Sequence, residues 1–101
     1  MKERLKKRLR ELTALTGVSG SEQVIVAYLK DAFSPYADSV EVDSWGNLIA
    51  TKKGKREGPK LMISAHSDEI GMVVKSIHGD GFISFDRVGG VSEILLPGRK
   101  V

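Results

Sequence analysis

The first residues of the chain repeat apolar side chains with the period of an α-helix. Leu5, Leu9 and Leu12 follow the i, i+4, i+7 spacing of one helix face, with charged residues between them. This spacing predicts an amphipathic helix over residues 2–16. Gly17 is expected to end it, because glycine is a poor helix former and a common helix terminator.

A second helical pattern follows a short glycine-containing loop, residues 17–20. Ser19 and Glu22 have the S-x-x-E spacing of a capping box, which marks a helix start. The apolar positions after it predict a helix over residues 21–33. Pro35 supports an end at this point, because proline lacks an amide donor and disfavours helical geometry in the residue before it.

Beyond residue 38 the pattern changes to the alternation and short apolar runs that are typical of β-strands. We expect about six short strands, over residues 40–42, 48–51, 60–65, 71–77, 82–85 and 91–96. Turns at 45–47 and 78–81 and a polar loop at 52–59 separate them, and residues 99–101 resemble the opening of another strand. The run 60–65 is apolar throughout its centre, as in a strand buried on both faces. Two helices followed by strands predict an α+β arrangement, with too few helices to cover both faces of a large sheet.

Composition narrows the class of protein. The 101 residues are 41% hydrophobic and 29% charged, which is typical of a soluble globular protein and argues against disorder. Cysteine is absent, so disulfides and thiolate metal sites are excluded. No apolar run approaches the roughly 20 residues of a membrane span, and charges interrupt any signal-peptide core. We therefore expect a cytoplasmic protein.

Positive charge is concentrated at one end of the chain. Residues 1–10 hold six Lys/Arg and one Glu, whereas the remainder holds ten basic and twelve acidic residues. A second basic stretch covers residues 52–56. Such patches could bind nucleic acid or an anionic membrane, but solvated surface charge is the commoner explanation. Neither patch is interleaved with aromatic residues, so we predict no nucleic-acid and no membrane partner.

The segment that most clearly suggests a functional site is Leu61–Gly71, in which an apolar run leads into His66 and Asp68. Residues i and i+2 of an extended chain point to the same side, so these two side chains can face one point. A neutral imidazole that binds a metal commonly donates its other N–H to a carboxylate. The alternative is a strand-end histidine and an aspartate that caps the following turn, and the spacing by itself does not decide between them.

Three further residues admit two interpretations each. Glu69 could face the same site, although successive strand residues point in opposite directions and a structural role is equally reasonable. His78 could be a ligand, but the sequence His78-Gly79-Asp80-Gly81 is that of a hairpin turn. Trp45 could stack on a ligand, but burial over a sheet edge is the commoner fate of a large aromatic side chain.

Four stretches resemble, in order, the N-terminal part of the dinuclear-zinc glutamyl-aminopeptidase family, whose members include tetrahedral particles and are sometimes labelled cellulase M or endoglucanase. The matching stretches are residues 15–22, 43–50, 65–71 and 81–85 with 88–90, and the third is the most specific. A glycosidase would need two opposed carboxylates, whereas Asp68 and Glu69 are adjacent.

The resemblance implies a metal-dependent aminopeptidase that removes N-terminal residues from peptides. It implies that His66 is a metal ligand and that Asp68 is the catalytic acidic residue that supports it. It further implies two divalent ions (zinc or cobalt), a glutamate general base and a homo-oligomeric complete enzyme. It also implies that residues 1–70 form the front part of an α/β peptidase domain and that residues 71–101 lead into an inserted β-rich dimerisation domain.

The remaining ligands and the general base have no counterpart in these 101 residues, which would hold at most one partial metal site. We therefore expect the chain to be an N-terminal segment that is inactive without the remainder of the peptidase chain. The alternative is a non-catalytic module that has kept the front half of the family and binds a sister subunit or another partner through exposed strands.

Overall fold

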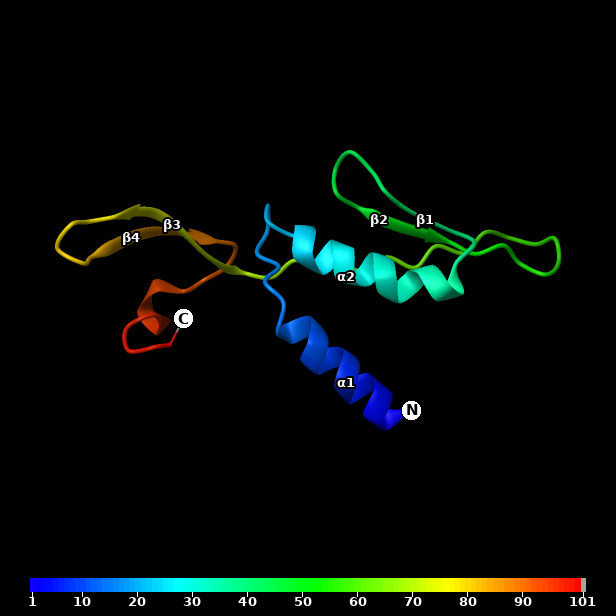
Figure 1. Ribbon diagram of the computed structural model, residues 1–101, viewed down its shortest axis with the longest axis horizontal. Helices are drawn as coiled ribbons and strands as arrows, with labels where there is room; N and C mark the ends of the chain where they lie inside the picture. The colour runs from blue at the N-terminus through cyan, green and yellow to red at the C-terminus, as the bar shows by residue number, and fades with distance from the viewer. Residues whose placement is uncertain (101) are drawn as a thin grey trace. The chain divides into compact units, whose positions relative to one another are not determined.

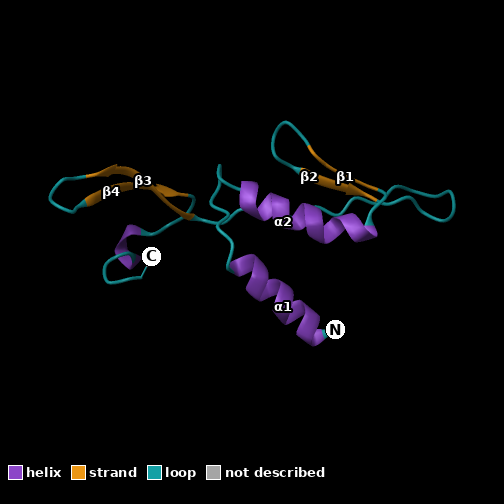
Figure 2. Cartoon of the chain, viewed as in Figure 1, coloured by secondary structure: helices purple, strands orange, loops and turns teal. Residues whose placement is uncertain are grey.

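The computed structural model describes residues 1–100, which form two compact units (Figure 1). The first unit comprises residues 1–17 and 21–67, and the second comprises residues 18–20 and the chain from Asp68 on. The first unit contains both α-helices and one antiparallel hairpin, and the second contains another hairpin (Figure 2). Helices with antiparallel strands confirm the α+β prediction.

Helix α1 covers Lys2–Thr13 and ends three residues before the predicted boundary. The Thr13 hydroxyl donates to the carbonyl of Leu9 at 2.8 Å, one turn back. The amide of Ala14 donates to the carbonyl of Glu11 at 3.3 Å, and that of Leu15 donates to the carbonyl of Leu12 at 3.2 Å, which closes the last turn. Local hydrogen bonding of this kind ends the helix before Gly17 is reached.

Helix α2 covers Gln23–Phe33, and the 3₁₀ turn η1 (Ser34–Tyr36) follows it with proline in its first turn. The predicted end at Phe33 is confirmed. The predicted capping box is wrong, because Glu22 is the N-cap residue and the Ser19 hydroxyl binds elsewhere.

The first hairpin pairs β1 (Ser39–Val42) with β2 (Leu48–Thr51), and it lies alongside α2 (Figure 1). Among residues 1–100, Ile25 of α2 is the one buried hydrophobic side chain, at 8% exposure. It lies against Gly17, where a side chain would meet the Ile25 methyl groups at 3.3–3.5 Å. The core of this unit is therefore very small.

The β1–β2 turn is organised by Asp43. One carboxylate oxygen accepts the amides of Trp45 and Asn47, each at 2.9 Å, and the other accepts the Asn47 side-chain amide at 2.9 Å. These hydrogen bonds hold the pKa of Asp43 below its usual value. The hydrogen bond from the Asn47 side chain contributes most to this lowering. Trp45 is 89% exposed in this turn, so the expectation of burial over a sheet edge is wrong for this residue.

The expected strand over residues 60–65 is not formed. Residues 52–67 contain neither helix nor strand, and Leu61, Met62 and Ile63 are 87%, 86% and 88% exposed. An apolar strand requires neighbouring strands to pair with and layers to cover it. No neighbouring strand pairs with this segment in the described part of the chain.

The second unit is built on β3 (Gly71–Ile77) paired antiparallel with β4 (Ile83–Val88). The turn between them is the predicted one: the amide of His78 donates to the carbonyl of Phe82 at 2.8 Å, and Gly81 has a φ of +91°. In place of the expected strand over 91–96 the chain forms the 3₁₀ turn η2 (Glu93–Leu95). The last expected strand opening, residues 99–101, extends outside the described residues.

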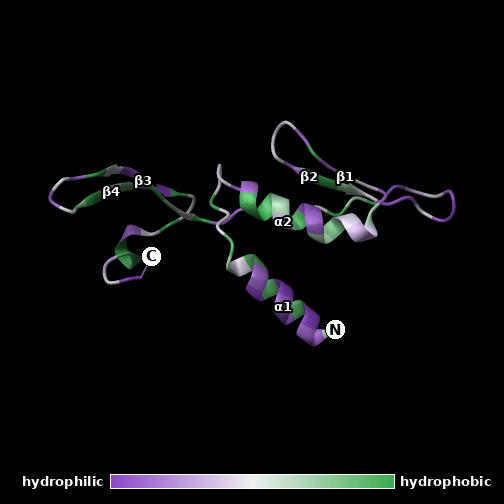
Figure 3. Ribbon diagram, viewed as in Figure 1, coloured by the Kyte–Doolittle hydropathy of each residue, from purple (hydrophilic) through white to green (hydrophobic). Residues whose placement is uncertain are grey.

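Figure 3 shows apolar and polar residues mixed along both helices and both hairpins. In the described part of the chain, neither helix combines the length and the apolarity that crossing a bilayer would require.

Gly71 offers a sharp test of the packing in the second unit. A Cβ at this position would lie 2.5 Å from Cγ2 of Val18, whereas a Cβ at Gly79 would meet nothing within 4 Å. We expect Gly71→Ala to destabilise this unit by about 1–3 kcal/mol, the usual effect of overpacking. Gly79→Ala serves as the control. Amide hydrogen exchange along β3 measures the effect, and equal protection in the two variants would contradict the packing.

Candidate functional site

His66 lies in the extended segment of the first unit. Its side chain is exposed, and it follows the exposed apolar residues Leu61–Ile63. The segment that was expected to hold it as a strand is unpaired, so the backbone around His66 lacks the support of a sheet. An imidazole at the surface can be reached by a metal ion from solution.

Asp68 begins the main segment of the second unit and is half-buried. Its Oδ2 accepts a short hydrogen bond from the hydroxyl of Ser19. The backbone supports the same pairing, because Val18 and Glu69 form a parallel bridge and the Ser19 amide donates to the Glu69 carbonyl at 3.3 Å. The loop before α2 therefore holds the Asp68 carboxylate in place.

Ser19 was missed as a site residue by sequence reasoning, which assigned it to a helix cap. The two residues are 49 positions apart, and no local pattern links them. The stretches 15–22 and 65–71 both resemble the same family, and this is the only sequence feature that links Ser19 with Asp68. The resemblance does not by itself predict a contact between the two stretches.

Two other candidates have structural roles within the second unit. The Glu69 side chain is exposed, and its carbonyl takes part in the bridge to Val18 and Ser19. His78 opens the β3–β4 turn, and its Nε2 lies 2.8 Å from the Ser84 hydroxyl and 3.3 Å from that of Ser76. The interpretation of His78 as a turn residue is confirmed.

The side chains of residues 1–100 supply only part of what a metal site needs. A tetrahedral zinc site takes at least three protein ligands. Among residues 1–100 no group of three or more His, Cys, Asp or Glu side chains lies close enough to hold an ion. His66 and Asp68 have suitable donor atoms, so the residues present fit a part of a ligand set.

Comparison with known proteins gives a consistent result. The sequence profile of M42 glutamyl aminopeptidase matches residues 46–101. The lysyl aminopeptidase of Pyrococcus furiosus is 37% identical over 98 residues, covering 92% of this chain and 27% of its own length. A crystal structure of an endoglucanase from Thermotoga maritima is 44% identical with a TM-score of 0.83, covering 89% of this chain and 29% of that one. A TET aminopeptidase from a marine-sediment archaeon of the Thaumarchaeota is 32% identical with a TM-score of 0.77, covering 88% and 24%.

The chain therefore spans less than a third of the length of each of these proteins. These TM-scores show that the chain has the fold of the corresponding part of the solved structures.

Proposed function

Because this chain belongs to the M42 glutamyl aminopeptidase family, we propose that it supplies the N-terminal part of a metal-dependent aminopeptidase acting on peptides. The observation that carries the proposal is the family match over residues 46–101, which includes the His66–Asp68 motif. The substrate class and the homo-oligomeric, cytoplasmic setting belong to the same proposal. The substrate class is supported by aminopeptidases among the similar proteins.

In this proposal His66 is a ligand of one of two divalent ions, zinc or cobalt, and Asp68 is the acidic residue that orients it. Bound ions of this kind lower the pKa of water and polarise the scissile carbonyl. Asp68 is suited to a positioning role because Ser19 donates to Oδ2. Each carboxylate oxygen has two lone pairs, so a carboxylate can accept an imidazole N–H beside another donor.

Exposed apolar surface supports a larger protein or assembly. Leu61, Met62 and Ile63 are 87%, 86% and 88% exposed, and Leu5 and Leu9 of the apolar stripe of α1 are 71% and 61% exposed. Contiguous exposed apolar surface of this kind commonly marks an interaction site. We propose that the remainder of a peptidase chain covers this surface and supplies the missing ligands and the general base, so that residues 1–101 are inactive by themselves.

An activity assay tests the proposal. The chain, mixed with or joined to the remainder of the Pyrococcus furiosus lysyl aminopeptidase, should release N-terminal residues from a peptide panel and lose activity on treatment with a chelator. The isolated 101-residue chain should release none. The same relative cut at the equivalent position and reassembled is the control for assembly. If this control is active and the hybrid binds its remainder yet stays inactive, the chain is a non-catalytic module instead.

A further inference from the structure

The charged face of α1 is turned toward α2 and η1. Arg4, Lys7, Arg8 and Glu11 follow the i, i+3, i+4, i+7 spacing of one helix face. The neighbouring apolar stripe is left outside, with Leu5 and Leu9 exposed. A solvated outer face was the expected role of the basic residues, and the structure instead gathers part of them within the first unit.

Tyr28 of α2 fixes one side of this charged face. The Arg8 Nη1 donates to the Tyr28 hydroxyl at 2.9 Å, and that hydroxyl donates to Oε2 of Glu11 at 2.5 Å. The Arg8 guanidinium also lies 5.9 Å from the centre of the Tyr28 ring. The hydrogen bond from Tyr28 is the largest cause of a lowered pKa at Glu11, so this carboxylate is charged at neutral pH.

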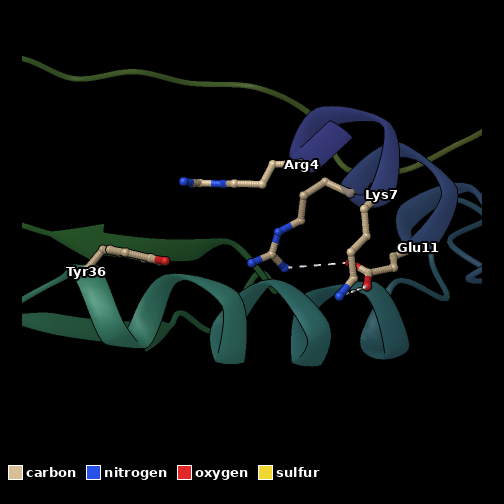
Figure 4. A pocket seen from close by; sticks show the side chains of 5 residues that line it. Arg4, Lys7, Glu11 and Tyr36 are labelled. Carbon is tan, nitrogen blue, oxygen red and sulfur yellow. Dashed lines mark ion pairs between the residues drawn. The ribbon is translucent and has the colours of Figure 1, made fainter. Parts of the chain in front are cut away.

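These side chains line a cavity of about 190 Å³ together with Tyr36 of η1. Figure 4 shows Arg4 extending from α1 toward Tyr36, whereas Lys7 and Glu11 point toward each other at the other end of the lining. Glu11 is shared by two cations, with Lys7 Nζ at 3.7 Å and Arg8 Nη1 at 3.9 Å. No ion pair of Arg4 is found within residues 1–100. Three cations and one carboxylate leave the lining with two uncompensated positive charges.

We propose that this cavity binds a phosphate group, as inorganic phosphate or as a small phosphomonoester. A phosphate carries between one and two negative charges at neutral pH, which matches the excess charge better than a single carboxylate does. Its oxygens accept from guanidinium and ammonium groups, and arginine suits phosphate geometry particularly well. The Tyr36 hydroxyl adds a neutral donor at the edge of the cavity. Glu11 is already occupied by Tyr28, Lys7 and Arg8, so it does not compete for the added donors.

The proposal is tested on the 101-residue chain by following amide and arginine side-chain NMR shifts during titration with sodium phosphate. Glycerol 3-phosphate in a parallel titration distinguishes a phosphomonoester from the free ion, and a short single-stranded oligonucleotide tests the alternative of a polyanion. The variants are Arg4→Gln and Lys7→Gln, with Lys55→Gln in the polar loop as the charge-matched control. Glutamine keeps helix propensity, so α1 should persist in both variants.

We expect saturable shifts at Arg4, Lys7 and Tyr36, and about tenfold weaker phosphate binding in Arg4→Gln and in Lys7→Gln than in Lys55→Gln. A stronger response to glycerol 3-phosphate than to phosphate would identify the phosphomonoester as the ligand. Equal affinities in Arg4→Gln and Lys55→Gln, from whatever cause, overturn the proposal. Binding of the oligonucleotide without binding of phosphate also overturns it and favours non-specific polyanion binding.

Discussion

Replacing His66 by alanine should weaken metal binding by more than about 100-fold in the enzyme assembled from this chain and the remainder of the Pyrococcus furiosus relative. Losing an outer-shell partner of a ligand already costs about 10–100-fold in affinity, and losing the ligand itself removes a bond to the ion. Metal content after dialysis against a range of buffered zinc concentrations measures the effect. Peptide hydrolysis should fall with it.

His78→Ala is the matched control for His66→Ala. Both residues are exposed, but His78 lies in the β3–β4 turn and its imidazole contacts the hydroxyls of Ser76 and Ser84. Metal content should therefore be unchanged in this variant. Metal content at the level of the unsubstituted chain in both variants would remove His66 from the proposed ligand set, while loss of metal in both would indicate a non-specific effect of histidine removal.

The elements that sequence alone predicted correctly are those stabilised by local interactions. The α2 helix end at Phe33, the strand Leu48–Thr51 and the strand Gly71–Ile77 were all placed at the observed boundary. Periodicity, proline and turn-forming glycine act over a few residues, so their consequences can be read along the chain.

The features that were predicted wrongly or not at all depend on contacts between residues distant in the sequence. Ser19 has the spacing of a helix cap, yet its hydroxyl binds Asp68 because residues 18–20 pair with the segment after the motif. The cavity beside α1 depends on Tyr28 and Tyr36, which no charge pattern in residues 1–10 indicates. The expected strand over 60–65 fails for a related reason, because a fully apolar strand is stable only between neighbours.

The unformed strand over residues 60–65 is the segment that we expect to pair with the rest of a peptidase chain. We expect Ile63→Lys to weaken binding to the remainder of the Pyrococcus furiosus relative by at least about 100-fold. Burial of an isoleucine contributes about 1.5–3 kcal/mol, and burying a lysine charge in its place adds a further cost, with 1.4 kcal/mol for each tenfold change. Isothermal titration of one part with the other measures the affinity.

Ile94→Lys is the control, because Ile94 is also exposed, at 89% compared with 88% for Ile63, but lies in the turn η2. If exposure alone determined the effect, the two substitutions would weaken association equally. If residues 60–65 become a strand covered on both faces, only Ile63→Lys should weaken association. The amides of residues 61–63 should also gain hydrogen-exchange protection when the two parts associate. Because His66 follows this segment directly, the same pairing would give the proposed metal ligand a rigid, sheet-supported backbone.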